Sequence, residues 1–504
     1  MFSNFVDNLS IGLTTALTLS NLFYCFIGVL LGTLVGVLPG IGALAAISLL
    51  LPITFHLDAT SAIVMLAGVF YGASYGGSTA SILLNLPGTP SAAVACLDGY
   101  PMARKGRAGV ALLMTTIASF VGGSIGIVIM MLMSPLIVDA ALQFGPAEYF
   151  SMMVLGLVAA STISSGSAIK GIAMVVFGIL LGTAGSDIET GAARFAFDIP
   201  ELYDGVSLVV VAMGLFGISE VIASIRTIRY GEVDSKSITF RSMIPTRDEV
   251  GRSWMPMLRG TSLGSFFGAL PGTGGVIASF MAYAVEKKIA RDPSRFGKGA
   301  IEGIAAPEAA NNAADQTAFI PTMTLGIPGN VTMALLLGAL TIHGIVPGPQ
   351  LMTKHPDMFW GLIMSFWIGN VLLVILNIPL IGIWIRLLVV PYHLLYPTIL
   401  MFVCIGVYSI NNSPFDVVLV MVFGALGYAM RLFGFQPAPL LLGFVLGPLM
   451  EENLRRTLLI SRGDFMVFFE RPISATVMAI TFALLAWAAF GALRAAPARP
   501  ADAT

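Results

Sequence analysis

The stretch Gly28-Val-Leu-Leu-Gly-Thr-Leu-Val-Gly-Val-Leu-Pro-Gly-Ile-Gly42 has a counterpart later in the chain, Gly260-Thr-Ser-Leu-Gly-Ser-Phe-Phe-Gly-Ala-Leu-Pro-Gly-Thr-Gly274. Both stretches carry glycine at every fourth position and end in Leu-Pro-Gly-x-Gly, and matching residues are 232 positions apart. Glycine at every fourth position is a common packing face of membrane helices, but it does not require the same ending in the same register. Leu86-Pro-Gly88 and Ile327-Pro-Gly329 match further along, at an offset of 241. We therefore predict an internal duplication.

The composition of the chain restricts the class of protein. Of 504 residues, 26 are Lys or Arg and 27 are Asp or Glu, so that 11% are charged, against about 25% in soluble globular proteins. Hydrophobic residues make up 57%, and mean hydropathy is +0.90. These values exclude an ordinary soluble enzyme, a disordered chain and a nucleic-acid binder with a basic face. Long continuous apolar runs, without the alternation of a transmembrane barrel, indicate an all-α polytopic membrane protein.

The most polar segment divides the two copies. Residues 226–259 contain seven basic and four acidic residues, and basic segments stay in the cytoplasm. We predict a first transmembrane repeat over 1–225, a cytoplasmic linker over 226–259, a second transmembrane repeat over 260–493 and a C-terminal tail over 494–504. The acidic loop 185–204 is expected on the outer side. The exact number of membrane spans stays open at this point.

The distribution of basic residues predicts that the repeats have inverted topology. In the first half, the loop after the first motif lacks Lys and Arg, whereas Arg104, Lys105 and Arg107 follow the second motif. In the second half the order is reversed, because five basic residues follow the first motif within 286–298 and only Lys354 and His355 lie within 347–358. With positive loops inside, the two halves point in opposite directions.

The assignment of loops to membrane sides by their basic residues also predicts re-entrant hairpins. Residues 260–285 lie between two segments expected in the cytoplasm, so this stretch must enter and leave on one side. Its Pro-Gly-Thr-Gly centre breaks a helix, which predicts a hairpin with its tip at Pro271–Gly275. The matching tip in the first half is Pro39–Gly42. A full membrane span over 22–38 is the alternative there.

Two polar clusters within apolar runs are the candidate chemistry, since polar residues at membrane depth indicate function by default. They are Tyr71–Ser81 followed by Asn85–Pro90, and Pro307–Thr317 followed by Thr322–Asn330. Each run is interrupted by Pro-Gly, which is typical of a discontinuous helix. Such breaks expose N–H groups that bind anions, and carboxylate and hydroxyl oxygens suit a coupling cation.

These patterns give two sets of candidate residues. The predicted substrate-binding residues are Pro39, Gly40, Gly42, Ser78, Thr79, Asn85, Pro87, Gly88, Thr89, Pro271, Gly272, Thr273, Gly274, Thr324, Pro328, Gly329 and Asn330. The predicted cation-binding residues are Ser74, Ser81, Asn311, Asn312, Asp315, Gln316 and Thr317. Glu308 is left open between a cation ligand and an acid that reaches the membrane surface. No catalytic residue, metal centre or cofactor is predicted, because the three cysteines and four histidines show no ligand spacing.

Functions of another class were also weighed. Gly272-Thr-Gly-Gly275 resembles part of a nucleotide-binding loop, but no strand precedes it and no Lys follows, so this reading is rejected. An intramembrane hydrolase is not favoured, because the sequence shows no Ser–His spacing of the kind that such an enzyme needs. A membrane scaffold or an intramembrane enzyme without transport activity is the alternative to a transporter.

The motifs resemble a known family. Gly36–Gly42, Tyr71-Gly-Ala-Ser-Tyr-Gly-Gly-Ser78 and Asn85-Leu-Pro-Gly-Thr-Pro90 are similar to the large membrane subunit of the tripartite tricarboxylate transporters, the TctA family. Residues 268–274 and 306–328 resemble its second half, and the resemblance covers nearly the whole chain.

The resemblance implies a function and partners. It implies a permease of the bacterial inner membrane that works with a small membrane subunit and a periplasmic solute-binding protein. It also implies uptake of citrate and other small carboxylates, driven by a cation gradient (Na⁺ or H⁺) and not by ATP. An elevator-type motion is expected by analogy with other carboxylate carriers that have paired hairpins.

Overall fold

The computed structural model describes residues 2–38, 42–163, 167–187, 189–224, 240–270, 274–388 and 392–494. Helices account for 81% of the structure. Six of the described helices are long and apolar enough to cross a membrane, in agreement with the predicted all-α polytopic membrane protein: Leu19–Val37, Ala59–Leu84, Ala108–Ala141, Pro356–Asn377, Pro414–Leu432 and Pro472–Phe490.

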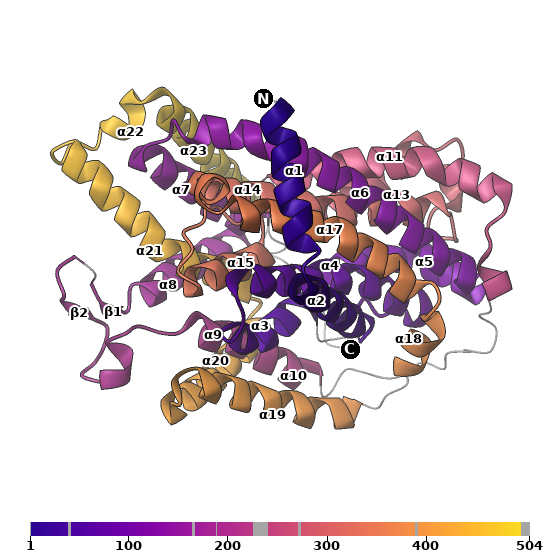
Figure 1. Ribbon diagram of the computed structural model, residues 1–504, viewed down its shortest axis with the longest axis horizontal. Coiled ribbons are helices and arrows are strands. Elements are labelled where there is room, and N and C mark those ends of the chain that lie inside the picture. The colour runs from indigo at the N-terminus through magenta and orange to yellow at the C-terminus, as the bar shows by residue number, and fades with distance from the viewer. Residues whose placement is uncertain are drawn as a thin grey trace. The chain divides into compact units, whose positions relative to one another are not determined.

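The chain forms two compact units, and each takes segments from both halves of the sequence (Figure 1). Unit 1 comprises residues 1–142 and 207–428, and unit 2 comprises residues 143–206 and 429–504. The helices of unit 1 are α1 (Phe2–Ala16), α2 (Leu19–Val37), α3 (Gly42–Thr54), α4 (Ala59–Leu84), η1 (Pro90–Ala92), α5 (Ala93–Arg104), α6 (Ala108–Ala141), α9 (Leu208–Ala212), η3 (Met213–Ile218), α10 (Ser219–Ser224), η5 (Phe240–Met243), α11 (Arg247–Ala269), α12 (Gly274–Ile289), η6 (Pro293–Arg295), α13 (Glu302–Thr317), α14 (Phe319–Leu325), α15 (Val331–Ile342), α16 (Pro349–Lys354), α17 (Pro356–Asn377), α18 (Ile381–Leu387), α19 (Tyr392–Asn411) and most of α20 (Pro414–Leu432). The elements of unit 2 are α7 (Pro146–Ile163), α8 (Ala168–Gly182), β1 (Gly185–Ser186), β2 (Ala193–Arg194), η2 (Pro200–Leu202), α21 (Pro437–Ile460), α22 (Val467–Glu470) and α23 (Pro472–Arg494).

The repeated glycines make the same contacts in both halves. A Cβ atom on any of the six repeated glycines within α2 and α11 would collide with the backbone of the facing helix, so each marks a point where two helix backbones touch. In the first half Gly28, Gly32 and Gly36 of α2 face Met65, Val69 and Ala73 of α4; in the second, Gly260, Gly264 and Gly268 of α11 face Ala306, Ala310 and Ala314 of α13. The facing residues differ by 241 positions and the glycines by 232, which are the two offsets of the sequence repeat.

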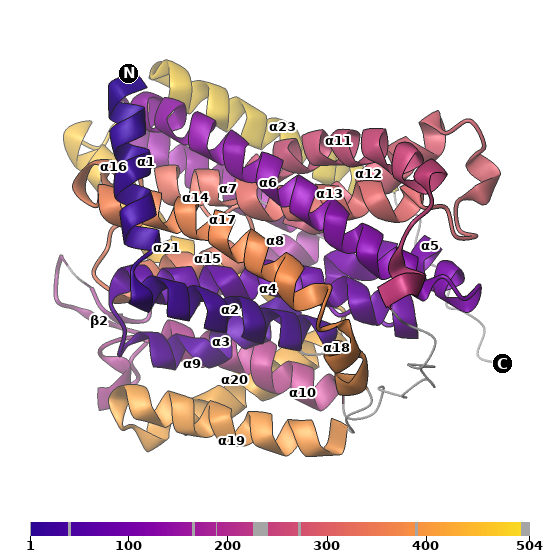
Figure 2. The same cartoon turned by 45° about the vertical axis from the view of Figure 1, so that its right-hand side comes forward.

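Two pairs of helices are interrupted at the predicted Leu-Pro-Gly sequences. Helix α2 is followed by α3, and α11 by α12; Figure 2 shows the members of each pair side by side. The connecting residues 39–41 and 271–273 lie outside the described residues. Helix α2 is long and apolar enough to cross a membrane. A full membrane span over 22–38, the alternative to a hairpin arm, requires this.

Helix α11 begins at Arg247, inside the segment predicted as a linker over 226–259. The difference has a local cause. Thr246 accepts a hydrogen bond from the backbone of Glu249, and the Glu249 side chain accepts one from the backbone of Thr246, which forms a capping box. Residues 225–239 of the predicted linker, and 495–504 of the predicted tail, lie outside the described residues.

The basic segments that the sequence places in the cytoplasm lie together in unit 1. The Lys105 amine donates to the backbone oxygen of Lys298 at 2.5 Å. Arg107 donates to Glu249 at 2.8 Å, and Arg252 donates to Glu302 at 3.0 Å. These bonds join the ends of α5, α11 and α13, so loops from both halves share one end of the unit.

Unit 2 is held by close helix packing and by ion pairs. Gly178 of α8 faces Leu440 of α21, and Gly443 of α21 faces Val175 of α8. Arg455 of α21 pairs with Asp187 at 2.6 Å and with Glu451, and Arg194 also pairs with Asp187. The hydrogen bond from Arg455 and those from the backbone of residues 189–190 hold the pKa of Asp187 well below its ordinary value. The short β1–β2 hairpin is therefore fastened to α21.

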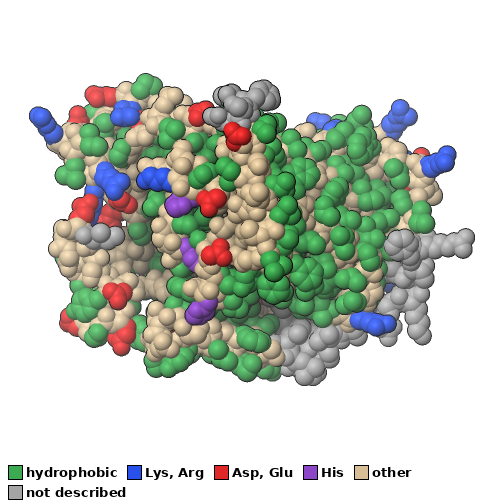
Figure 3. Space-filling model, in the orientation of Figure 1, with side chains coloured by type: hydrophobic (Ala, Val, Ile, Leu, Met, Phe, Trp, Pro, Cys, Tyr) green, Lys and Arg blue, Asp and Glu red, His purple; other side chains and the backbone are tan. Residues whose placement is uncertain are grey.

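A wide hydrophobic surface with few charged side chains covers the face that carries α2 and α17 (Figure 3). Exposed hydrophobic residues of these two helices include Phe23, Phe26, Val371 and Ile375. An apolar area of this extent on a soluble protein would be unusual, and it suits contact with lipid.

Candidate functional site

Helices α4 and α13 meet at the positions where the two repeats match. The hydroxyl of Ser74 on α4 donates to the carboxylate of Asp315 on α13. These two residues are 241 positions apart, which is the repeat offset, so they occupy the same position in the two copies. Both are buried, with 4% of each exposed. The equivalent residues of the two repeats are thus in direct contact at the centre of unit 1.

A second polar group lies further along α13. The Glu308 carboxylate accepts hydrogen bonds from Ser78 of α4 at 2.6 Å and from Ser119 of α6 at 2.9 Å. The amide of Asn312 donates to Ser119 at 2.8 Å and to Glu308 at 3.3 Å. Glu308 and Asn312 are one turn apart, so a helix places them on the same face. Glu308 is buried and does not reach the surface of unit 1, as an interfacial acid would.

Within the described part of the chain, these two carboxylates have neither the arginine partner of four other buried acids nor the backbone N–H donors of Asp98. Among the described residues, seven Asp and Glu side chains are buried, and no Lys or Arg is. Glu148, Asp187, Glu249 and Glu286 each pair with an arginine. Asp98 accepts from the backbone N–H groups of residues 299 and 300 and from the Tyr283 hydroxyl. For Glu308 and Asp315 the hydrogen-bond partners are hydroxyl and amide groups, so their charge needs another source of compensation.

Asn311 points to the beginning of α12, on a different side of α13 from Asn312. A Cβ atom on Gly275 would collide with the Asn311 side-chain oxygen and would lie 3.3 Å from the Asp315 carboxylate. Asn311 is 2% exposed, and neither its amide nitrogen nor its amide oxygen has a partner. Helix α12 therefore begins directly against an unpartnered amide and a carboxylate.

The Pro-Gly breaks lie against the ends of the glycine-rich helices. Gly88 touches the backbone oxygen of Gly36, and its counterpart Gly329 lies near that of Gly268. Helix α4 ends at Asn85 and α14 at Gly326, both in left-handed conformation. At the start of α15 the Asn330 side chain accepts from the N–H of Met333 at 2.9 Å. One of the first N–H groups of α15 is thus already hydrogen-bonded to the Asn330 cap, whereas the sequence predicts that the N–H groups at this helix end are free.

The structure brings some predicted site residues together and not others. Ser74, Ser78, Asn311, Asn312 and Asp315 converge around α13, and Gly274 and Asn330 lie next to each other at the α12 and α15 ends. The Gln316 side chain packs against Gly126 of α6, with its oxygen unpartnered. The hydroxyls of Ser81, Thr317 and Thr324 bond carbonyls of their own helices, whereas Thr89 lies near Ser91 and Gly77.

The remaining predicted residues lie at the edges of this arrangement or outside the description. Asn85 and Pro87 are exposed, Gly42 is half-buried, and Thr79 and Pro328 are buried. Pro39, Gly40, Pro271, Gly272 and Thr273 lie outside the described residues.

Sequence reasoning missed polar residues on α6 and α17. Ser119 is a ligand of Glu308, and Asn370 of α17 accepts from the Tyr75 hydroxyl at 2.5 Å while donating to Ser124 at 3.0 Å. Both lie in long apolar helices, and a polar Ser or Asn within such a helix is the sequence feature that could have identified them.

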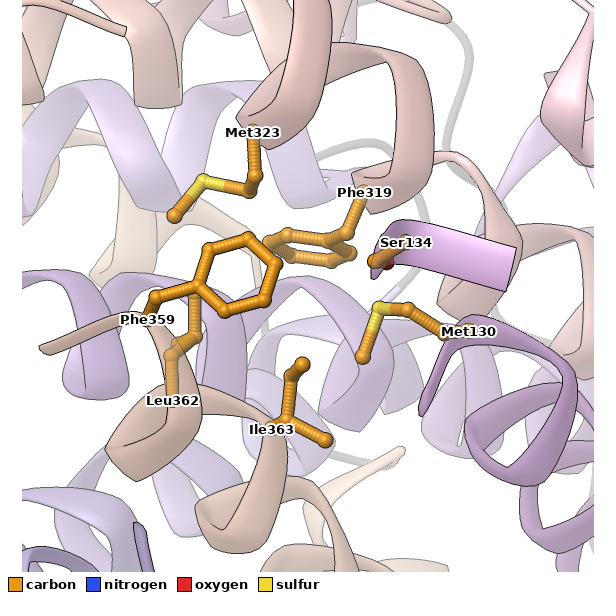
Figure 4. Close-up of a pocket in the computed structure, with 7 residues that line it drawn as sticks. All are labelled: Met130, Ser134, Phe319, Met323, Phe359, Leu362 and Ile363. Carbon is orange, nitrogen blue, oxygen red and sulfur yellow. The ribbon is translucent and has the colours of Figure 1, made fainter. Parts of the chain in front are cut away.

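A small cavity in unit 1 is separate from this site. It measures about 10 Å³ and is lined by Met130, Ser134, Phe319, Met323, Phe359, Leu362 and Ile363 (Figure 4). The Ser134 hydroxyl is the one polar group of this lining, and it has no partner. A space of this size holds about one water molecule, so it is not a substrate pocket, and it contains none of the predicted site residues.

Comparison with known proteins identifies the family. Residues 22–442 match the model of the tripartite tricarboxylate transporter TctA family. The chain belongs to the TctA family. This family is the membrane component of tripartite tricarboxylate transporters, so the chain is a multi-pass membrane protein of a transporter family, and an enzymatic role is not implied.

Two relatives come from Agrobacterium vitis. One, described as an uncharacterized 52.8 kDa protein in the TAR-I ttuC' 3' region, is 50% identical over 489 residues, which cover 97% of each chain. The other, described as an uncharacterized protein in the TAR-II ttuC' 3' region, is 58% identical over 217 residues, which cover 43% of this chain and 90% of the relative. No solved structure matches.

Proposed function

We propose that this TctA protein is the permease subunit of a binding-protein-dependent secondary transporter in the bacterial inner membrane. It imports small di- or tricarboxylates such as citrate, coupled to a gradient of Na⁺ or H⁺, and works with a small membrane subunit and a periplasmic solute-binding protein. The observation that carries the proposal is the buried Asp315 carboxylate, which lies without a Lys or Arg partner beside the start of α12. Its charge is compensated by the coupling cation.

The substrate is held by neutral donors and helix ends. Helix α12 has 16 residues, and its first N–H groups carry partial positive charge. The unpartnered Asn311 amide lies against the same end. A cation at Asp315 next to these donors attracts a carboxylate, and without the cation the negative charge of Asp315 repels it. The order of binding is therefore cation first, which couples the two fluxes.

The repeats are proposed to be inverted and to move as an elevator. The α2–α3 and α11–α12 pairs form re-entrant hairpins that approach the centre from opposite sides. The equivalence of their glycine contacts supports the duplication, and the joining of basic loops from both halves at one end of unit 1 supports the inversion. Unit 1, which contains the candidate site, carries the substrate, and unit 2 is the static part.

Uptake measurements test the function. Cells expressing this chain with its small membrane subunit and binding protein are expected to accumulate labelled citrate or another small carboxylate, and to lose uptake when this chain is omitted. Collapse of the Na⁺ and H⁺ gradients is expected to abolish accumulation, whereas depletion of ATP with the gradients clamped is not. A system that shows no carboxylate uptake under any gradient would favour the alternative of a scaffold or an intramembrane enzyme.

Accessibility of single cysteines tests the topology. In a cysteine-free background, Ser242→Cys and Ser294→Cys are expected to react with a membrane-impermeant maleimide only from the cytoplasm, because both lie in basic segments. Thr353→Cys, which is exposed in α16 just before α17, is the matched control and is expected to react only from outside. Labelling of residues 242 and 294 from opposite sides would contradict the re-entrant hairpin between them.

A further inference from the structure

The Glu308 group is separate from the Asp315 group. The two carboxylates are seven residues apart on α13, which corresponds to about 10 Å along a helix axis. Asp315 contacts Ser74 and lies beside the start of α12, whereas Glu308 contacts Ser78 of α4 and Ser119 of α6. The proposed substrate site at α12 therefore does not use Glu308, and the role of this buried acid is unexplained by it.

The donors around Glu308 favour its ionised form. Both carboxylate oxygens accept hydroxyl hydrogen bonds, at 2.6 and 2.9 Å, and one also accepts from the Asn312 amide at 3.3 Å. Hydrogen bonds to a carboxylate stabilise its charge. A buried negative charge of this kind needs a positive charge nearby, and the described residues place no Lys or Arg side chain in contact with it. Burial opposes this charge, so it must be compensated by a bound ion or neutralised by a proton.

The side chains around Glu308 supply the oxygen ligands that a small hard cation prefers. The two carboxylate oxygens and the hydroxyls of Ser78 and Ser119 converge from three helices. The side-chain oxygen of Asn312 is an independent sign of a ligand, because this residue is fully buried and its oxygen has no partner. Rotation of the amide exchanges its nitrogen for this oxygen on the side of Glu308, which completes a set of five oxygens.

The polar group around Glu308 occurs in only one of the two repeats. At the offset of 241, the counterpart of Glu308 is Ala67, that of Asn312 is Tyr71, and that of Ser78 is Phe319. The equivalent region of the other copy is apolar: the rings of Phe70 and Phe319 are 6.3 Å apart and those of Phe319 and Phe366 are 4.7 Å apart. Packing of the duplicated helices therefore does not require polar side chains at these positions, and their presence in one copy calls for a ligand.

We propose that Glu308, Ser78, Ser119 and Asn312 form a binding site for one dehydrated monovalent metal cation of the size of Na⁺, distinct from the site at Asp315. This ion is additional to the coupling cation proposed at Asp315, and its binding does not depend on the proposed transport function. A proton would neutralise Glu308 at one oxygen, whereas a small metal cation can be coordinated by all five oxygens together. The set of oxygens therefore favours a metal cation.

Cation-dependent stabilisation of the purified chain tests the site without transport. NaCl, compared with choline chloride at equal ionic strength, is expected to raise the thermal unfolding midpoint. Glu308→Gln is expected to raise the Na⁺ concentration for half-maximal stabilisation at least about tenfold, the lower end of the loss for a ligand-shell change. Ser78→Ala and Ser119→Ala, which retain the carboxylate, are expected to shift it in the same direction. Glu302→Gln is the control, because this acid on the same helix is paired with Arg252 and Arg295.

The outcomes separate this site from the transport function. Na⁺ stabilisation that depends on Glu308 supports the site even where no carboxylate uptake is found, and in that case the proposed function alone fails. Uptake together with stabilisation that is insensitive to Na⁺, or equally strong in Glu308→Gln and in the native chain, would overturn the site. A response to pH with none to Na⁺ would also overturn it, since it would identify the ligand as a proton. If Glu308→Gln does not fold, the two serine variants decide.

Discussion

Replacing Asp315 by asparagine is expected to reduce carboxylate uptake by at least about 25-fold. The substitution keeps the shape of the side chain and its contact with Ser74, but it removes the negative charge that holds the coupling cation. Loss of one partner from a buried charged pair costs about 2–5 kcal/mol, and about 1.4 kcal/mol corresponds to a factor of ten. Initial rates of labelled citrate uptake into proteoliposomes, with the binding protein in excess, measure the effect.

The dependence on the cation gives the sharper readout. Because the cation is expected to bind before the substrate, residual uptake by Asp315→Asn should no longer respond to the Na⁺ or H⁺ gradient. Ser253→Ala is the matched control, since the buried Ser253 hydroxyl bonds the carbonyl of Glu249 within its own helix, and its uptake should stay within about twofold of the native rate. Unchanged uptake and cation dependence in Asp315→Asn would remove Asp315 from the site.

Replacing Gly264 by valine is expected to lower the free energy of unfolding by about 1–3 kcal/mol or more, the usual range for an overpacked core. The added side chain would collide with the backbone of Ala310, which cannot move aside as a flexible side chain would. Helix α13 would have to separate from α11, and this movement would carry Asp315 away from the start of α12. Thermal unfolding of the detergent-solubilised protein, followed by the loss of its monodisperse chromatographic peak, measures the change.

A second glycine on the same helix provides the comparison. Gly251 lies in α11, and a Cβ atom placed on it would meet nothing within 4 Å. Gly251→Ala should therefore be neutral or stabilise by up to about 1 kcal/mol, because alanine restricts the unfolded chain and favours a helix. Gly32→Val, the counterpart in the first half, should resemble Gly264→Val. Equal stability of the Gly264→Val and Gly251→Ala variants would show that α11 and α13 do not pack as described.

The helix contacts could be predicted from the glycine pattern, because a row of glycines on one helix face allows the backbone of another helix to approach closely. A helix with Gly28, Gly32 and Gly36 on one face allows a backbone to approach, and the constant offset predicts that the second copy does the same. The interruptions after α2 and α11 were predictable for a similar reason, since Pro-Gly cannot continue a helix. The family could also be recognised, because its motifs are local.

The ligands of Glu308 could not be predicted, because they depend on how three helices are rotated about their axes. Ser119 is separated from Glu308 by 189 positions, and no local pattern relates the two. The division into two units has the same origin: residues 143–206 and 429–504 come together through the packing of α8 on α21, which is a long-range contact. The start of α11 within the predicted linker also depends on local and long-range contacts, because Glu249 caps this helix end with Thr246 and pairs with Arg107.

The bond between Ser74 and Asp315 constrains how a duplicated gene can diverge. Where equivalent residues touch each other, an exact copy would put two carboxylates or two hydroxyls face to face. Two carboxylates would repel each other, so that one would have to take up a proton, and two hydroxyls would leave no charge for an ion. A carrier made of two identical halves would therefore hold a single negative charge at its centre only by keeping a proton there, and unlike residues at this position remove that requirement.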